Sequence, residues 1–476
     1  MREYEKYDAL GLAELVRKGE VSPVELLDAA LARVSARNPA LNALCMSFEA
    51  RARRQIAAGL PAGPFRGVPF LLKDLHAHVA GERLTFGSRL FASFVSETDS
   101  ELVARYRRAG LVTFGRTASP EFGLTATTES TLFGATRNPW NLERTSGGSS
   151  GGASAAVAAG ILPAAHASDG GGSIRIPAAC CGLFGLKPTR ARVPMGPHSG
   201  EGWGGMSTAH AVTRSVRDSA ALLDATQGPD LGAPYHAPAP ERPYLEEVTR
   251  APGKLRIALQ TQTFNGAETD PECAAAARAA AKLCEGLGHR VEEATLAVDR
   301  AALAVATQVL MGANVQATAD DAAAAQGRAL GPDVLETVTL AIIAAVRPAA
   351  AADYARAVKV IHGVSRVVEA FFTRFDVLLT PTMAMQTARI GELALSNPAN
   401  ATYGQRISRC VGYTQLFNAS GNPAMSVPLG TASDGMPLGV QFAGRFGDEA
   451  TLFRLAAQLE AAQPWAERRP AVAAVG

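Results

Sequence analysis

The chain has 476 residues, of which 47% are apolar and 19% are charged, and its 46 basic and 44 acidic side chains leave a formal net charge of +2. This composition is typical of a folded globular protein and excludes a disordered chain. The balanced charge argues against nucleic acid as a partner. No apolar run reaches the roughly 18 residues of a membrane span, the nearest being 338–346, so we expect no membrane segment.

Six cysteines stand at positions 45, 180, 181, 273, 284 and 410, and none of them forms a C-x-x-C pair. In a chain of this length, that pattern predicts buried thiols in a reducing compartment rather than a disulfide scaffold. The first residues, MREYEKYDAL, carry neither an apolar signal core nor a lipidation motif. We therefore expect a cytoplasmic protein.

Helical and strand patterns alternate from one end of the chain to the other. A capping box at Ser22, followed by Pro23, predicts a helix that ends at Asn38-Pro39. Residues 65–75 predict a short buried strand that ends in charge. Further helices are expected at 100–109, 151–159, 216–226, 271–287 and 448–460, and further strands at 111–114, 161–166, 254–260, 374–380 and 437–443. The alternation predicts a layered α/β fold.

Two segments bear on the domain organisation. Residues 227–253 are rich in proline and are typical either of a domain boundary or of a surface crossover inside one domain, and we favour the crossover. The alanine-rich stretch 299–360 predicts helices. They form either a pocket wall or lid, or plain packing helices.

Glycine is concentrated in the region 145–190, with eight glycines between positions 147 and 172. Glycine lets consecutive backbone N–H groups turn inward around a ligand, because no Cβ blocks unusual dihedral angles. Such a backbone beside a nucleophilic serine is what an oxyanion hole requires. The alternative is that these residues form two flexible loops.

Other short motifs carry less weight. Residues 147–151 fit the G-x-S-x-G pattern, but the polar segment before them predicts no strand, which that turn requires. A G-x-G-x-x-G match at 200–205 lacks the flanking strand and helix of a dinucleotide site. Asp74, His76 and His78 would alternate on one face of a strand and could hold a metal, although no second cluster supports such a site. We expect no cofactor and no metal.

Several of these segments resemble the amidase signature family. The resemblance rests on GGSSGG at 147–152, DGGGSIRIPAACCGLFGLKPT at 169–189 and the lysine of GVPFLLKD at 67–74, and extends to ATRNPWN at 135–141 and LFNASGNPAMSVPLG at 416–430. It implies a single large α/β domain over residues 1–476, with a central mixed β-sheet covered by helices on both faces. The signature core would span about 65–215, and the helical pocket wall about 299–360.

The resemblance also implies roles for individual residues. Ser173 would be the nucleophile, Ser149 a bridging serine that follows a cis peptide bond, and Lys73 the base. Ser150 competes for the bridging role, but the separation of 173 − 149 = 24 residues favours Ser149. The chemistry that these roles require is a Ser-cisSer-Lys relay.

The glycines before the nucleophile would form the oxyanion hole. Its donors would be the backbone N–H groups of Gly170, Gly171, Gly172 and Ser173. Asp169 and Arg175 would brace this loop. Members of the family often carry threonine or isoleucine where Gly170 stands, a difference that a purely backbone role tolerates.

Elementary chemistry supports lysine as the base. A serine hydroxyl is a weak nucleophile until a base takes its proton. A lysine can be that base if it stays neutral, and burial lowers a lysine pKa by up to ~3–5 pH units. Lys73, one of only seven lysines, follows the apolar run 68–72. The alternative is an exposed lysine paired with Asp74, but strand alternation points Asp74 to the opposite face.

The substrate is less closely defined by the sequence. The C-terminal segments are most similar to bacterial amidases that include 6-aminohexanoate cyclic-dimer hydrolases, and aryl-acylamidases and urethane-cleaving enzymes are similar in plan. We expect a small neutral amide or carbamate as substrate, and a monomer or homodimer. A cyclic amide, or a non-catalytic subunit that depends on partners, is the alternative. The expected pocket residues are Leu132, Phe133, Trp203 and Met206, with parts of 307–314 and 410–417.

Overall fold

Strands and helices alternate along the computed structural model, which describes residues 3–397 and 402–474. The predicted domain, 1–476, includes a few residues outside these ranges. The strands are β1 (Leu44–Ser47), β2 (Pro69–Lys73), β3 (Val112–Thr117), β4 (Glu129–Ser130), β5 (Gly134–Ala135), β6 (Arg137–Asn138), β7 (Asn141–Thr145), β8 (Ala164–Asp169), β9 (Phe184–Lys187), β10 (Thr208–Thr213), β11 (Arg256–Leu259), β12 (Arg290–Glu293), β13 (Val377–Pro381), β14 (Ala424–Thr431) and β15 (Pro437–Gly444). The helices are α1 (Ala9–Arg17), α2 (Pro23–Leu41), α3 (Glu49–Ala57), α4 (Glu101–Arg108), α5 (Gly151–Ala158), α6 (Arg175–Cys181), α7 (Val216–Thr226), α8 (Tyr244–Glu247), α9 (Pro271–Gly286), α10 (Arg300–Ala325), α11 (Thr337–Val346), α12 (Ala351–Phe372), α13 (Tyr403–Val411), α14 (Gln415–Ser420) and α15 (Glu449–Ala462).

An eight-stranded sheet forms the centre of the molecule, with strand order β12-β11-β13-β15-β14-β9-β10-β8. Strand β11 pairs in parallel with β12 and β13, and the other pairs are antiparallel, so the sheet is mixed. A smaller sheet, β1-β3-β2, lies against the edge strand β8. The predicted α/β fold with a central mixed sheet is confirmed.

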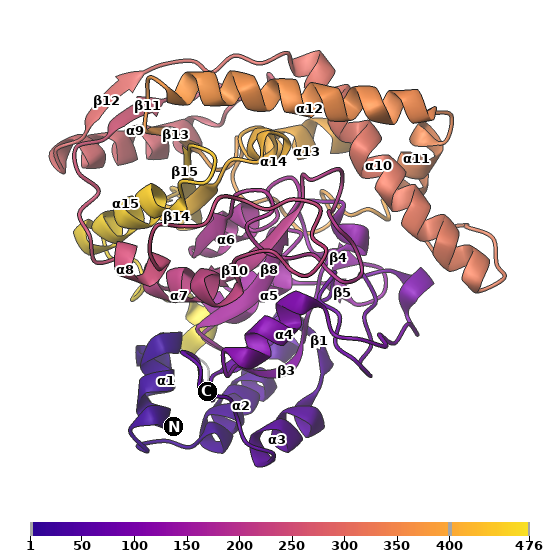
Figure 1. Ribbon diagram of the computed structural model, residues 1–476, viewed down its shortest axis with the longest axis vertical. Helices are drawn as coiled ribbons and strands as arrows, with labels where there is room; N and C mark the ends of the chain where they lie inside the picture. Colours follow the sequence, from indigo (N-terminus) through magenta and orange to yellow (C-terminus); the bar gives the residue numbers. More distant parts are fainter. Residues whose placement is uncertain (1–2, 398–401, 475–476) are drawn as a thin grey trace.

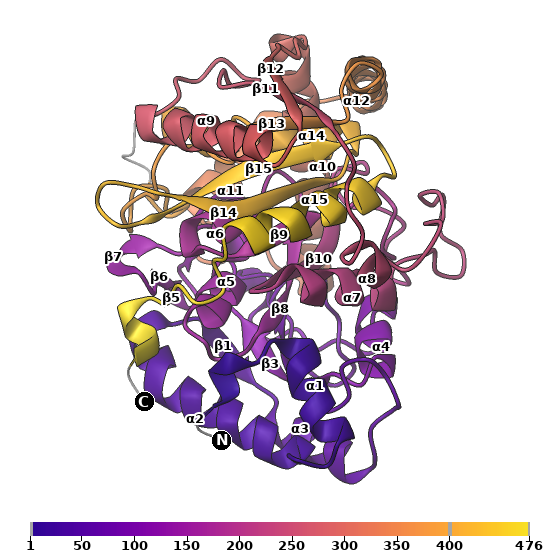
Figure 2. The ribbon, with the colours of Figure 1, turned by 90° about the vertical axis from the view of Figure 1, so that its left-hand side faces the viewer.

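Helices pack on both faces of the large sheet, because its strands are apolar on both sides (Figure 2). On β9, Phe184 and Leu186 point to one face, where the Phe184 ring lies 6.5 Å from that of Phe453 on α15. Gly185 points to the other face, where an added Cβ would lie 2.7 Å from Ala178 on α6. Helices α7, α9 and α15 thus cover one face, and α6, α12 and α14 cover the other.

The N-terminal helices and the long helix α12 lie at opposite ends of the molecule (Figure 1). Helices α2 and α3, in indigo, pack against the small sheet, α1 packs against α7, and α12, in orange, lies at the other end. The predicted helical stretch 299–360 forms three helices, α10, α11 and α12, of which α12 continues to Phe372. Residues 227–253 cross from α7 to β11 and contain only the short helix α8, as expected of a crossover.

Most predicted elements are present with small shifts at their ends, and α7 has the predicted bounds. The predicted end of α2 is wrong, because the helix passes through Pro39 and ends at Leu41, with Asn42 in a left-handed conformation at φ 52°. Proline in the last turn costs only one helical hydrogen bond, so it does not stop the helix there. Strand β8 begins at Ala164, three residues later than predicted, directly after Pro163.

No single helix in the part of the chain that the structure describes is long and apolar enough to cross a membrane. Helices α11 and α12 pass that test only together, by length and composition, and they are bent by 102°. All six cysteines lie within the described ranges and are free; five are buried and Cys45 is partly buried. The prediction of free, buried thiols is confirmed for five of the six cysteines, and Cys45 is the exception.

Candidate active site

Lys73 is the last residue of β2 and its side chain is fully buried. Its Nζ lies 2.7 Å from Ser149 Oγ and 3.0 Å from the hydroxyls of both Ser150 and Ser168. Burial lowers the pKa of Lys73 to about 7, although the charge of Asp169 opposes the shift. A neutral amine has two N–H donors and one lone pair, so it can accept a proton from one of these hydroxyls.

Ser149 and Ser150 are held beside this amine by a tightly packed loop, in which positions 147 and 148 have room only for glycine. The Gly148–Ser149 peptide bond is cis, as the resemblance implies. A Cβ at Gly148 would lie 2.3 Å from the Thr127 carbonyl oxygen, and Gly147 has φ +76°. The close approach of backbone to backbone therefore explains the paired glycines of GGSSGG.

The loop 169–173 meets this serine pair from the end of β8. The Ser150 N–H donates to the Ser173 carbonyl at 3.2 Å. The Asp169 carboxylate accepts from the Gly172 N–H at 2.7 Å and from the Ile174 N–H at 3.1 Å, which fixes the turn that carries Ser173. Ser173 itself is half-buried, whereas Ser149 and Ser150 are buried.

Arg175 holds the loop 169–173 in place through its contacts with Asp169. Its guanidinium donates to both Asp169 oxygens at 2.8 and 2.9 Å, to the Asn418 side chain at 2.7 Å and to Gln441 at 2.8 Å. Both members of the ion pair are fully buried. Burial alone would raise the pKa of Asp169, but Arg175 and Asn418 hold it well below its usual range. The predicted bracing residues are therefore in direct contact with each other and with the loop.

A cavity of about 480 Å³ has walls formed by neighbours of these serines, and Lys73, Ser149, Ser150 and Ser173 are not themselves among its lining residues. A Cβ at Gly123 would lie 3.0 Å from both Ser149 Oγ and the Leu75 side chain, and Leu75 lines the cavity. Trp203, which also lines it, lies against Gly170. The rest of the wall is mainly aromatic, with Phe86, Phe91, Phe94, Phe122, His76, His78 and His198.

Only one of the four predicted pocket residues lines this cavity. Trp203 does, but Leu132 and Phe133 lie in the turn between β4 and β5. Met206 is packed in the core and its carbonyl accepts from Asn418 at 3.1 Å. Of the predicted ranges, 307–314 contributes only Asn314 to the lining and 410–417 contributes nothing.

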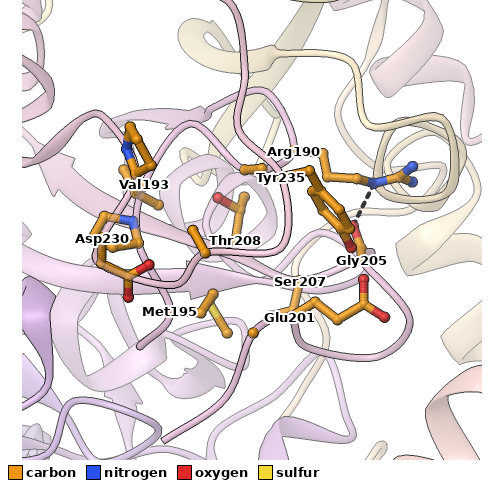
Figure 3. A pocket seen from close by; sticks show the side chains of 14 residues that line it. Arg190, Val193, Met195, Glu201, Gly205, Ser207, Thr208, Asp230 and Tyr235 are labelled. Carbon is orange, nitrogen blue, oxygen red and sulfur yellow. Dashed lines mark hydrogen bonds between the residues drawn. The ribbon is translucent and has the colours of Figure 1, made fainter. Parts of the chain in front are cut away.

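A second pocket adjoins the cavity and shares Met195 and Glu201 with it (Figure 3). Arg190 donates from Nε to the Gly205 carbonyl at 2.7 Å on one side of this pocket. Its volume of about 20 Å³ leaves room for a water-sized group but not for an amide substrate. The larger cavity is therefore the candidate substrate site.

Comparison with known proteins agrees with this geometry. The sequence matches the amidase family over residues 25–453. A 6-aminohexanoate-cyclic-dimer hydrolase of Paenarthrobacter ureafaciens is 41% identical to it over 97% of this chain and 96% of its own. The chain belongs to the amidase signature family.

Solved structures agree with the assignment. A 6-aminohexanoate cyclic dimer hydrolase complexed with substrate is similar with a TM-score of 0.93 and 39% identity, covering 98% of this chain and 99% of its own. A bacterial aryl acylamidase of the amidase signature family has a TM-score of 0.89 and 28% identity, covering 97% of each chain. The protein is thus an amidase, an enzyme that hydrolyses amides.

The predicted strand face with Asp74, His76 and His78 is wrong, because β2 of the amidase ends at Lys73. Asp74 is buried and accepts from the Thr85 N–H at 2.9 Å, so it is not the partner of Lys73. His78 pairs with Ser96 at 2.9 Å. Within residues 3–397 and 402–474, no group of three or more His, Cys, Asp or Glu side chains is arranged to hold a metal.

Sequence reasoning missed Ser168, which contacts Lys73, and Asn418, which contacts Asp169. The predicted strand 161–166 stopped short of Ser168. In the structure His166 and Ser168 share one face of β8, and His166 accepts from the Lys73 N–H. The prediction that no strand precedes residues 147–151 is also wrong. Strand β7 ends at Thr145, although it pairs only with β6.

Replacing Arg175 with methionine is expected to destabilise the amidase by about 3–5 kcal/mol, because Asp169 would remain as an unpaired buried charge. The contribution of Asp169 has a defined pH dependence. Its folded pKa is lowered, so the stabilisation is fully present above roughly pH 4 and is lost as the pH falls. Chemical denaturation across pH measures both effects.

The control is Arg356→Met, which removes a guanidinium from an exposed i,i+3 pair with Asp353. That change is expected to leave the free energy of unfolding nearly unaltered. Equal effects of the two variants would contradict the bracing role of Arg175.

Proposed function

We propose that the amidase hydrolyses the C–N bond of small neutral amides through an acyl-enzyme on Ser173, with Ser149 and Lys73 as proton relay. The observation that carries the proposal is the buried Lys73 amine, 2.7 Å from Ser149 Oγ. Among the described residues no carboxylate forms an ion pair with it, and the charge of Asp169 offsets the cost of burying the charged amine only in part. A lysine that is neutral near pH 7 is a suitable general base.

The reaction divides into two halves. In the first, Ser173 Oγ attacks the amide carbon while its proton passes to Ser149, whose own proton passes to Lys73. The backbone N–H groups of Gly170, Gly171 and Ser173 hold the developing oxyanion, each good donor contributing about 3 kcal/mol. The predicted donor Gly172 is not among them, because its N–H donates to Asp169 at 2.7 Å. Ser149 then returns a proton to the amide nitrogen, because an amide anion is a very poor leaving group, and the C–N bond breaks.

The second half releases the acyl group. Water attacks the ester carbon of the acyl-enzyme as Ser149 and Lys73 accept its proton. The ester C–O bond breaks, Ser173 Oγ regains a proton and the carboxylic acid leaves. Ser150, which also contacts Lys73 and bonds the Ser173 carbonyl, holds the relay in place.

The charges of the cavity favour a neutral substrate. Its described lining contains Glu201 and Asp321 but neither lysine nor arginine. Burial lowers the pKa of His78 to about 3, so this imidazole adds no positive charge at pH 7. A carboxylate on the substrate would therefore find no counter-charge there, whereas rings and methylene groups would contact aromatic walls.

Two anilides of the same shape test this, one neutral and one with a carboxylate on its acyl group. We expect kcat/KM for the neutral anilide to be roughly tenfold or more higher, which corresponds to about 1.4 kcal/mol. Asp321→Asn should narrow this ratio several-fold, and high salt should narrow it too. The control is Asp320→Asn, whose carboxylate pairs with Arg347 instead of lining the cavity. A preference for the anionic substrate would contradict this assignment.

Cyclic amides are the second candidate substrates, because the hydrolase from Paenarthrobacter ureafaciens, named for a cyclic dimer, is 41% identical over nearly the whole chain. The purified protein should be assayed on linear, cyclic and aryl amides and on carbamates. Turnover of at least one neutral amide is the expected result. Failure on all of them would favour the alternative of a subunit that needs partners. Cytoplasmic location and a monomeric or homodimeric state remain part of the proposal.

A further inference from the structure

We propose that Trp203 determines the substrate specificity of this amidase. It does so by forming a flat wall beside the oxyanion loop, in a space that exists only because residue 170 is glycine. The inference rests on the proposed function, since it takes Gly170–Ser173 as the site of the reacting carbonyl. The substrates that it selects carry a planar apolar group next to the scissile bond.

The contact between Trp203 and Gly170 leaves no room for a side chain. A Cβ at Gly170 would lie 2.7 Å from both Cε3 and Cζ3 of the indole, closer than real Cβ contacts. Gly170 has no positive φ that would itself require glycine. The glycine is therefore explained by the indole rather than by the backbone, and a threonine or isoleucine here would displace Trp203.

The loop fixes the indole in this position. Trp203 has φ +53°, a left-handed conformation that costs a non-glycine residue about 1–2 kcal/mol. The strained residue is held by hydrogen bonds from the Gly205 and Ser207 N–H groups to the Gly202 carbonyl at 3.1 and 3.0 Å. Gly204 packs so closely on Leu310 of α10 that a Cβ there would lie 2.9 Å away. Strain that persists in a well-held residue next to a reaction site points to a functional constraint.

The indole also forms part of the cavity wall. Trp203 packs against two apolar clusters, one under the large sheet with Phe417 and one around the cavity with Phe122. Its side chain is only half-buried, so it keeps a surface open to the cavity. A carbonyl held by the loop at Gly170 has its substituent next to this surface. Aromatic faces bind flat apolar groups better than small or branched polar ones.

Two rate ratios test the inference. One is kcat/KM for benzamide over acetamide, which varies the acyl side, and the other is acetanilide over N-methylacetamide, which varies the amine side. Trp203→Ala is expected to lower one of these ratios roughly tenfold, with the effect mainly in KM, because the stacking surface is lost. The ratio that changes identifies the side of the bond that faces the indole.

Gly170→Ala should lower the same ratio, because its Cβ displaces the indole. In the double variant Gly170→Ala/Trp203→Ala the two effects should not add, since the indole is already absent. Trp203→Phe, which keeps a smaller ring, should give an intermediate ratio and serves if the alanine variant does not fold. The control Trp140→Phe changes a half-buried indole outside the cavity and should leave both ratios unchanged.

The outcomes separate the two levels of the argument. If the wild type hydrolyses these amides but the Trp203 variants change neither ratio, this inference is overturned and the proposed function stands. Additive effects in the double variant would overturn the steric link to Gly170. A wild-type protein that hydrolyses none of the four amides would contradict the proposed function itself.

Discussion

Ser173→Ala is expected to reduce kcat/KM for a neutral anilide by a factor on the order of 10⁶, the scale seen when a serine enzyme loses its nucleophile. Without the Ser173 hydroxyl no acyl-enzyme can form, and the oxyanion loop retains only its binding contribution. The change removes one oxygen from a half-buried residue, so the protein should stay folded. Steady-state kinetics and thermal melting measure the two effects.

The control for this variant is Ser154→Ala on α5. Ser154 is fully buried, and its Oγ has no hydrogen-bond partner among the described residues. Its removal should leave turnover close to that of the wild type. Substantial anilide hydrolysis by Ser173→Ala would assign the nucleophile to another residue, with Ser149 and Ser150 the next candidates.

Lys73→Met is expected to lower kcat/KM by about 10²–10⁴-fold through loss of the general base. It should not destabilise the protein at pH 7. Because burial lowers the pKa of Lys73 from its model-peptide value of 10.5 to about 7, the unfolded chain binds more protons between these values. The free energy of unfolding of the wild type therefore rises with pH between about 7 and 10.5. At and below pH 7 the wild type carries the cost of burying a charged amine, and methionine removes that cost.

The wild-type pH profile gives a second readout of the same residue. The neutral form of Lys73 is the base, so kcat/KM should rise with pH and level off above about 7. Lys187→Met is the matched control, since Lys187 is also buried with its pKa lowered to about 7, but its Nζ contacts the Pro188 carbonyl. It should keep most of the activity. Equal losses in both variants would show that a buried amine matters only for folding.

The sequence was most informative where backbone sterics decide the structure. GGSSGG and DGGGS mark places where the chain passes closer than a Cβ allows, as the contacts of Gly148 with Thr127 and of Gly172 with Thr414 show. Such constraints are local, so the spacing of glycines and serines indicates them. The position of Lys73 was also predictable, because an apolar run before a charged residue indicates a buried strand end.

The rest of the site depends on contacts between distant parts of the chain. Asn418 lies 249 positions from the Asp169 carboxylate that it contacts, and no local pattern encodes that pairing. Leu132 and Phe133 do not line the cavity, because the tertiary fold packs their turn against Asn42 and Glu336, segments that a local pattern does not connect to it. The end of α2 was also mispredicted from the sequence. A proline such as Pro39 in the last turn of a helix does not end it, and the sequence alone did not show that Pro39 lies in the last turn.

The role of Ser173 as nucleophile is tested most directly by covalent labelling with a fluorophosphonate, followed by peptide mass spectrometry. The reagent forms a stable phosphonyl ester with an activated serine as fluoride leaves. A single adduct on Ser173, absent from Ser173→Ala and much slower to form in Lys73→Met, is the expected result. An adduct on Ser149 or Ser150, or an enzyme that hydrolyses amides and is not labelled, would contradict the assignment of Ser173 as nucleophile.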